Sequence, residues 1–225
     1  MYPQMLLINF KYFFTLFFIC TSFGVTATET KWEVAIVFRG ASEDDAFQKD
    51  VDQNILELAR TIPGPLLKLA IYRELKNEVF SYIPNSVNGK ELSLGDILYR
   101  KDLNTIKIFG TLKKEKNLNL PKFLKSFFKD NDAKKALIIY SHGQGPNGLK
   151  NLSTKELKET LQQSTPHLDL LWLDACFMAN IEFLYELRGI SDYTVASEEA
   201  EFSSGLPFQN LDELTDIDNG REAAI

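Results

Sequence analysis

The 225-residue sequence has only two cysteines and two histidines, the residue types that most often bind transition metals or form cross-links. No Cys-x-x-Cys or His-Glu-x-x-His spacing occurs, and His142 and His167 are too few for a histidine-rich site. We therefore expect no metal site and no cofactor.

A basic stripe and nucleotide-binding motifs are also lacking. The net charge of -6 and the pI near 5.1 argue against a general affinity for nucleic acid. No Gly-x-Ser-x-Gly elbow and no Gly-Lys-Ser/Thr loop occur, which excludes the serine hydrolases and phosphate-binding proteins that depend on them. What the sequence does have, 44% hydrophobic and 25% charged residues, is typical of a globular protein with a sizeable core.

The amino terminus carries an uncharged apolar run, Tyr12–Phe23, which has about the length of a signal-peptide core and is too short to span a bilayer comfortably. Small residues precede a cleavage point after Ala27. We expect residues 1–27 to be a cleavable signal peptide and residues 28–225 to be secreted or periplasmic, without stable membrane association. An uncleaved membrane anchor stays open as an alternative, and so does a lipid anchor at Cys20, although the residues before it are not small.

Strand-like and helix-like segments alternate along the rest of the chain. A β-rich run at Val34–Phe38 is followed by apolar residues at helical spacing between residues 42 and 62, and then by a second strand. A strand, helix, strand unit is typical of a parallel sheet. The sequence predicts an α/β fold with a mostly parallel central sheet, whose strands begin at Val34, Leu66, Ala136, Leu168 and Tyr193.

The middle of the chain, residues 73–119, has weaker patterns. Residues 105–110 form one further strand candidate, and we expect the lysine-rich patch Lys113–Lys116 to be a solvated loop. After it, apolar residues recur at helical spacing from Leu120 to Phe128, with Pro121 suited to a first helical turn. This stripe predicts a core helix rather than a ligand site.

Two buried strands in the last third end in chemically reactive residues. The strand from Ala136 to Tyr140 runs into His142, and the strand from Leu168 runs into Asp174 and Cys176. Reactive groups collect at the carboxyl ends of parallel strands, because the loops there converge on one edge of the sheet. If the two strands are neighbours, an imidazole and a thiol meet, which is the arrangement that a cysteine nucleophile requires.

The segment after Cys176 predicts a helix, with Phe177, Ile181, Leu184 and Leu187 on one face. Cys176 would then lie near a helix amino terminus, where aligned peptide dipoles favour a thiolate. The backbone N–H groups of Gly143 and Cys176 are candidates for an oxyanion hole. A buried inert cysteine and a simple strand-ending turn at Gly143 remain the alternatives for these two residues.

Several motifs in order resemble the clostripain family of cysteine peptidases: the His-Gly that ends IIYSHG, DAC followed by FMANIEFLYEL, and YTVASEE at Tyr193–Glu199. The opening WEVAIVFRGASEDD is similar to that family's first strand and loop. The resemblance implies a caspase-haemoglobinase fold, an α/β/α sandwich, and a catalytic histidine and cysteine matching His142 and Cys176. It leaves calcium dependence open.

Asp174 has two interpretations. It can cap the predicted helix after it, or it can be the carboxylate at the base of the specificity pocket, which the family has at this position and which would pair with an arginine or lysine of the substrate. The resemblance favours the second. Ser197 is a further candidate for binding the peptide substrate, while Glu198 and Glu199 are as well explained by a solvated acidic loop.

The resemblance therefore implies an exported cysteine endopeptidase that cuts after Arg or Lys through a thioester intermediate. It also implies processing between the two catalytic residues, for which Lys150 in the Gly/Pro/Asn-rich loop is the candidate, an ordinary solvated lysine being the alternative. Family members run beyond Ile225 and their sheet has about six strands, one more than the five predicted. We expect either an incomplete domain, with the last strand in missing sequence, or a protein in which that strand never existed. The rival hypothesis is an inactive homologue that binds a basic peptide or a protein without cutting it.

Overall fold

The computed structural model describes the chain from Trp32 onward, in the ranges 32–39, 45–58, 67–75, 78–84, 110–114, 119–129, 132–165, 167–201, 205, 208–217 and 220–223. The predicted signal peptide, residues 1–27, lies outside these ranges. Within them, no helix is long and apolar enough to cross a membrane.

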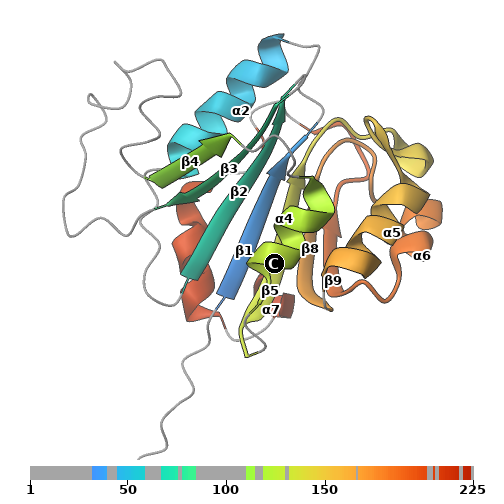
Figure 1. Cartoon of the computed structure of the whole chain (residues 1–225). Helices are drawn as coiled ribbons and strands as arrows, with labels where there is room; N and C mark the ends of the chain where they lie inside the picture. Colours follow the sequence, from blue (N-terminus) through green and yellow to red (C-terminus); the bar gives the residue numbers. More distant parts are fainter. Residues whose placement is uncertain are drawn as a thin grey trace, which may run out of the picture.

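A seven-stranded sheet forms the centre of the fold, in the order β4-β3-β2-β1-β5-β8-β9 (Figure 1). Five neighbouring strands are parallel, as the sequence predicts: β1 (Trp32–Phe38), β2 (Leu67–Leu75), β5 (Lys134–Tyr140), β8 (Leu168–Asp174) and β9 (Ser191–Ala196). The other two, β3 (Glu78–Pro84) and β4 (Gly110–Lys114), are antiparallel and extend the sheet beyond β2.

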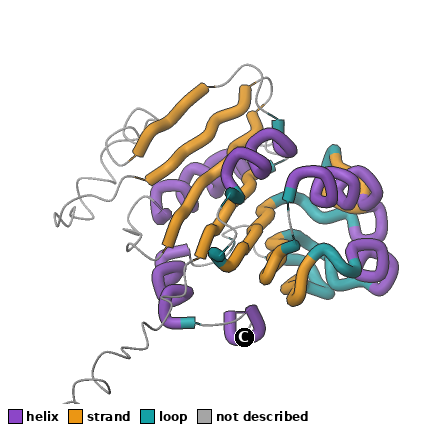
Figure 2. Tube along the Cα trace, turned by 60° about the horizontal axis from the view of Figure 1, so that its bottom comes forward, coloured by secondary structure: helices purple, strands orange, loops and turns teal. Residues whose placement is uncertain are grey.

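Helices cover both faces of the sheet, which confirms the predicted α/β/α sandwich (Figure 2). One face packs against α2 (Asp45–Leu58), the 3-10 helix η3 (Phe208–Asp216) and α7 (Gly220–Ala223). The other packs against α4 (Leu120–Phe127), α5 (Thr154–Ser164) and α6 (Ile181–Leu187). Because the central strands are buried on both sides, their sequences are almost continuously apolar rather than alternating.

Local signals in the sequence account for where two of the helices begin. Asn119 caps α4 by accepting a hydrogen bond from the Lys122 N–H, and Pro121 lies in the first turn as predicted. Ser153 and Glu156 form a capping box at the start of α5. These side chains satisfy N–H groups that have no partner inside the helix.

The middle of the chain differs from the prediction. The strand β3 was missed, because its sequence, EVFSYIP, includes a proline and lacks a long apolar run. The further strand candidate at residues 105–110 lies outside the described residues except for Gly110, where β4 begins. The prediction that Lys113–Lys116 is a loop is wrong for Lys113 and Lys114, which belong to β4 and pair with β3.

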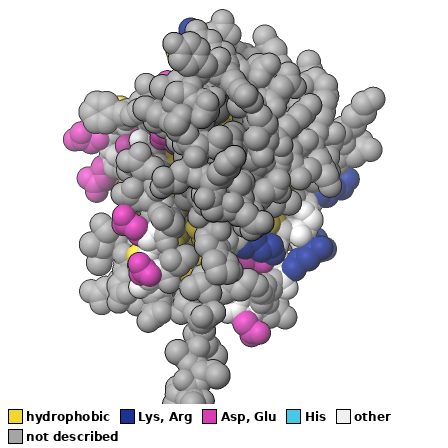
Figure 3. Space-filling model, turned by 90° about the vertical axis from the view of Figure 1, so that its left-hand side faces the viewer, with side chains coloured by type: hydrophobic (Ala, Val, Ile, Leu, Met, Phe, Trp, Pro, Cys, Tyr) yellow, Lys and Arg dark blue, Asp and Glu magenta, His cyan; other side chains and the backbone are white. Residues whose placement is uncertain are grey.

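Charged side chains are distributed unevenly over the described surface. On the face seen from the β4 side, most of the acidic side chains lie toward one side and the Lys and Arg side chains toward the other (Figure 3).

Candidate active site

Strand register brings His142 and Cys176 to the same point on the sheet edge. Strands β5 and β8 are parallel neighbours, and Tyr140 pairs with Asp174 at the last position of the ladder. His142 and Cys176 each follow these paired residues by two positions. A hydrogen bond of 3.2 Å from the Ser141 N–H to the Asp174 carbonyl continues the contact past the strand ends. The neighbouring strands that the sequence analysis required are therefore present.

Gly143 lies directly against the backbone of Cys176. A Cβ atom at this position would be 1.8 Å from the Cys176 carbonyl oxygen and 2.8 Å from its nitrogen. Real Cβ atoms never approach so closely, so only glycine fits without a backbone shift. The His-Gly dipeptide is thus explained by close packing of two backbone segments from different strand ends.

A small hairpin holds the histidine segment. It consists of β6 (Gly148–Leu149) and β7 (Leu152–Ser153), and Gly143 forms an antiparallel bridge with Leu149. The Lys150 N–H donates to the His142 carbonyl at 2.9 Å, and the Gln144 N–H donates to the Gly148 carbonyl at 2.8 Å. In an antiparallel ladder, a residue flanked by such bonds directs its own N–H away from the hairpin. This is the direction that a Gly143 oxyanion donor needs.

The imidazole of His142 packs on an aromatic ring that the sequence analysis did not select. The ring of Phe47, on α2, lies 4.3 Å from the imidazole between centroids, and it stacks on Tyr140 at 4.9 Å. The helix that carries Phe47 is tied to β2 by Arg73, which donates to Gln48 at 2.8 Å and forms an ion pair with Asp52. Phe47 was read only as a helix core residue, since no local pattern connects it with His142.

The thiol of Cys176 accepts a hydrogen bond from the chain that follows β9. The backbone N–H of Glu201 donates to Cys176 Sγ at 3.3 Å. Two carbonyl groups of the same segment also accept hydrogen bonds from the cysteine loop. The Phe177 N–H donates to the Glu199 carbonyl at 2.9 Å, and the Ala179 N–H donates to the Ser197 carbonyl at 2.8 Å. Residues 197–201 therefore run beside the cysteine loop.

The predicted helix after Cys176 begins later than expected. It is α6, it starts at Ile181 and Asn180 caps it, so Cys176 is not in its first turn and the helix-dipole argument was wrong. The predicted apolar face was also wrong in part, because Phe177 is 51% and Ile181 75% exposed. Phe177 has φ = 60°, a conformation rare for a bulky residue, which prevents the helix from starting there.

Asp174 lies in a cavity together with both reactive residues. The cavity has a volume of about 120 Å³, and its walls come from α2, the ends of β5 and β8, and the segment after β9: Phe47, Tyr140, Ser141, His142, Asp174, Ala175, Cys176 and Glu201. Only 4% of Asp174 is exposed. Because Asn180 is the cap of α6, Asp174 does not have that role. The pKa of Tyr140 is raised, mainly by burial and secondly by the charge of Asp174, so Tyr140 stays protonated beside this carboxylate.

Three other predicted residues, Ser197, Lys150 and His167, do not line this cavity. Ser197 borders the cysteine loop, but its hydroxyl accepts a hydrogen bond from the Glu199 N–H at 3.1 Å within its own loop. Lys150 lies in the turn of the hairpin, beside His142. His167 is at the opposite end of β8, where it contacts Asp192. Glu201, which lines the cavity, was not selected from the sequence because acidic residues 198, 199 and 201 look alike there.

A metal site does not emerge from the part of the chain that the structure describes, in which no three His, Cys, Asp or Glu side chains are grouped to hold an ion. The absence of a cofactor stays a prediction, and calcium dependence stays open.

Comparison with known proteins identifies relatives of the chain. The clostripain family (Peptidase_C11) matches residues 93–225, which is more than half of the sequence. No curated protein compared with the chain matches it.

Solved structures agree with this match. A secreted C11 cysteine protease from Bacteroides thetaiotaomicron, in complex with an irreversible peptide inhibitor, has 17% identity and a TM-score of 0.62, with 86% of this chain and 56% of that one covered. An inactive zymogen C11 protease from Parabacteroides distasonis has 21% identity and a TM-score of 0.54, with 87% and 57% covered. The chain spans little more than half the length of these proteins. Their likeness establishes the fold, and the family match over more than half of the sequence shows that this chain belongs to the clostripain family.

Proposed function

We propose that the protein is an exported cysteine endopeptidase in which Cys176 is the nucleophile and His142 the general acid and base. The Cys176 sulfur attacks the carbonyl carbon of the scissile peptide bond while His142 takes the thiol proton. His142 then donates this proton to the leaving amine, which leaves a thioester on Cys176. A water molecule, deprotonated by His142, hydrolyses the thioester and restores the thiol.

The observation that carries this proposal is the register of β5 and β8. It places the histidine and the cysteine two residues beyond the same paired position, and both line one cavity. Family membership supports the same chemistry, because the matched solved structures are cysteine proteases. The packing of His142 on Phe47 limits the freedom of the imidazole, which favours a single orientation of the ring.

The backbone N–H groups of Gly143 and Cys176 are the proposed oxyanion donors. Gly143 lies against the Cys176 backbone, and its N–H is directed away from the hairpin. Two donors from adjacent segments can converge on one carbonyl oxygen, which develops negative charge as the thiolate attacks.

Substrate preference is assigned to Asp174. Its buried carboxylate lies in the same cavity as Cys176, and the cavity also includes Glu201. A buried carboxylate beside the nucleophile favours a substrate with an arginine or lysine before the cut bond. The segment from Ser197 to Glu201 borders the cysteine loop, and Ser197 is proposed to contribute to peptide binding from there.

Export rests on the sequence of residues 1–27. The apolar run Tyr12–Phe23 and the small residues before the proposed cleavage after Ala27 form a signal peptide. The matched Bacteroides thetaiotaomicron protease is itself described as secreted, which supports this part of the proposal.

Turnover of a peptide amide with arginine before the cut bond tests the reaction. Replacing Cys176→Ala or His142→Ala in the full chain should lower kcat by more than about 1,000-fold. His167→Ala, at the other end of β8, is the matched histidine control and should keep wild-type turnover. If Cys176→Ala and the wild type turn over substrate equally, Cys176 is not the nucleophile. A folded wild type that binds the peptide without cutting it would support the rival hypothesis of an inactive binding protein.

Selectivity between arginine and glutamine substrates tests Asp174 separately. Asp174→Asn preserves the shape of the side chain and removes its charge, so we expect the ratio of kcat/KM for arginine over glutamine to fall about 100-fold. Asp192→Asn, at the amino end of β9, is the control for a general charge effect. An unchanged ratio in a folded Asp174→Asn variant would assign the preference elsewhere.

A further inference from the structure

The β1–β2 pair carries an ion pair at each end. At the amino end, Lys68 contacts Glu33, which is completely buried. At the carboxyl end, Arg39 Nε lies 3.4 Å from Glu74 Oε2, and only 16% of the Arg39 side chain is exposed. The second pair lies at the edge of the sheet where β5 and β8 end, although neither residue lines the cavity that holds Cys176.

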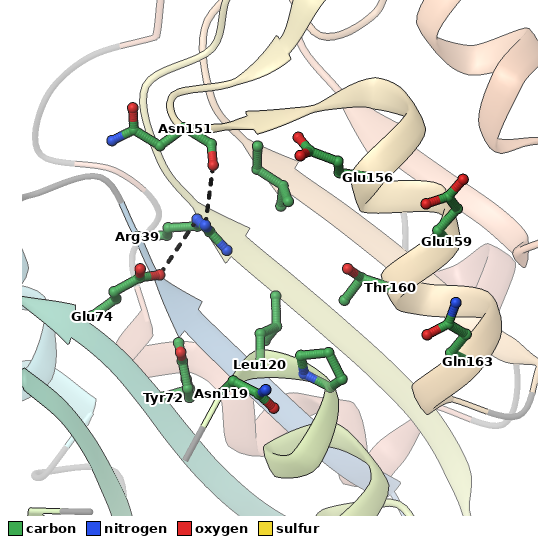
Figure 4. Close-up of a pocket in the computed structure, with 12 residues that line it drawn as sticks. Arg39, Tyr72, Glu74, Asn119, Leu120, Asn151, Glu156, Glu159, Thr160 and Gln163 are labelled. Atoms are coloured by element: carbon green, nitrogen blue, oxygen red, sulfur yellow. Dashed lines mark hydrogen bonds and ion pairs between the residues drawn. The ribbon is translucent and has the colours of Figure 1, made fainter. Parts of the chain in front are cut away.

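Arg39 reaches further than its partner Glu74. Its Nη2 donates to the Asn151 carbonyl at 3.1 Å (Figure 4). Its backbone N–H donates to the Tyr140 carbonyl, also at 3.1 Å. One arginine thus joins the ends of β1, β2 and β5 to the turn of the β6–β7 hairpin. Figure 4 shows the Asn151 carbonyl and the Glu74 carboxylate approaching the guanidinium from different sides.

The hairpin that Arg39 holds is the one that fixes the histidine segment. Lys150, the neighbour of Asn151, donates its N–H to the His142 carbonyl, and Leu149 bridges to Gly143. Gly143 in turn has no free space against the Cys176 backbone. A displacement of the hairpin would therefore be transmitted to Gly143 and His142 through backbone contacts.

We propose that Arg39 is a positioning residue of this site: by binding the Asn151 carbonyl it holds the β6–β7 hairpin, and through the hairpin it fixes His142 and Gly143 against Cys176. The proposal rests on the proposed function, since it assigns Arg39 to the same site. A guanidinium suits this role, because its planar fork can hold a carboxylate and a carbonyl at once, whereas an ammonium lacks that geometry.

Hydrogen exchange in the full chain tests the first half of the proposal without relying on activity. In Arg39→Ala, the backbone amides of Gln144 and Lys150 should exchange at least about tenfold faster than in the wild type, because the hairpin opens locally. Lys68→Gln is the matched control: it breaks the ion pair at the other end of the same strands and leaves Glu33 buried without its cation. In Lys68→Gln, the Gln144 and Lys150 amides should not exchange faster relative to the other amides of the sheet than they do in the wild type.

Kinetics test the second half. A hairpin that shifts by a fraction of an ångström misplaces the reacting groups, so Arg39→Ala should lower kcat about 10- to 100-fold while KM stays within about twofold. Lys68→Gln should keep the wild-type kcat at temperatures where it is folded. Arg39→Lys retains the charge beside Glu74 without the fork, and it should change in the same direction by a smaller factor. It also serves if Arg39→Ala does not fold.

Chemical rescue separates positioning from general stabilisation. A cavity of about 380 Å³, lined by Arg39, Glu74, Asn151 and residues of α4 and α5, gives small molecules access to the space that Arg39→Ala would create. Millimolar methylguanidinium should restore amide protection and kcat in Arg39→Ala and have no effect on Lys68→Gln.

Two results would overturn the proposal. One is equal exchange of the Gln144 and Lys150 amides in Arg39→Ala and Lys68→Gln, and the other is an opened hairpin with an unchanged kcat. If the wild type cuts no peptide, the proposed function fails, and the exchange comparison alone then decides whether Arg39 holds the hairpin.

Discussion

Gly143 carries more of the site geometry than its size suggests. It is the residue at which the histidine segment and the cysteine segment touch, and the contact leaves no volume for a methyl group. Phe177, which follows Cys176, has a different role. Its left-handed backbone conformation turns the chain after β8, so that α6 begins only at Ile181. Both residues set the path of the backbone next to Cys176, and neither supplies a reactive side chain.

A methyl group at Gly143 should therefore separate the two segments. We expect Gly143→Ala to lower the free energy of unfolding by about 2 kcal/mol and kcat/KM by about 100-fold, since the Cys176 carbonyl must move away. Urea unfolding and steady-state kinetics measure the two effects.

Gly189→Ala is the control for the glycine itself. Gly189 has φ = 80° but open space around its Cβ position. The substitution should cost about 1–2 kcal/mol of stability through backbone strain and leave kcat/KM intact. Wild-type kinetics in Gly143→Ala would mean that the backbone contact is not needed for turnover.

Among the elements, α6 shows how a short helix is tied to the cysteine loop. Its cap, Asn180, accepts a hydrogen bond from the Phe183 N–H at 2.9 Å and donates one to the Phe177 carbonyl at 2.8 Å. The second bond holds the strained residue that follows Cys176. Asn180 therefore both caps α6 and holds the cysteine loop, whereas an ordinary cap residue stabilises only its helix.

Replacing Asn180→Ala should affect both stability and activity. Loss of the cap costs about 1 kcal/mol in free energy of unfolding, and loss of the bond to Phe177 should lower kcat/KM about tenfold by loosening the loop. Asn119→Ala removes a cap of the same chemistry from α4 and should cost similar stability without the kinetic effect. Equal kinetics in the two variants would show that the Phe177 contact has no role in the site.

For the whole molecule, strand order decides where the chemistry lies. From the centre of the sheet, the chain leaves β1 toward β2 on one side and leaves β5 toward β8 on the other. Ligand sites of open α/β sheets form at the strand ends where the order reverses in this way. Arg39, His142 and the cavity of Cys176 all lie along this edge, and the β6–β7 hairpin connects them.

The hairpin also carries Lys150, the residue proposed for processing. The Lys150 N–H is hydrogen-bonded to the His142 carbonyl, and the Asn151 carbonyl is hydrogen-bonded to Arg39. Cleavage between Lys150 and Asn151 therefore requires the turn to open first. We expect slow cleavage after Lys150 that begins a new chain at Asn151, and none in Lys150→Gln. Sequencing of new amino termini during incubation measures it. A chain that stays intact while it cuts a peptide at full rate would show that processing is no activation step.

The sequence by itself determined the α/β class, the strands β5, β8 and β9 of the last third, and the positions of His142 and Cys176 at strand ends. These features depend on local patterns: apolar runs of strand length, helical spacing, and caps such as Ser153 with Glu156. The same patterns misplaced the start of α6, because the left-handed turn at Phe177 leaves no signal in composition.

Only the tertiary structure decided which distant residues meet. The pairing of Tyr140 with Asp174, the stacking of Phe47 on His142, the Glu201 donor at the thiol and the reach of Arg39 to Asn151 each join segments far apart in the chain. Such contacts follow from strand order and register. These are set by the packing of the whole sheet between its two helical layers, and no window of the sequence encodes them.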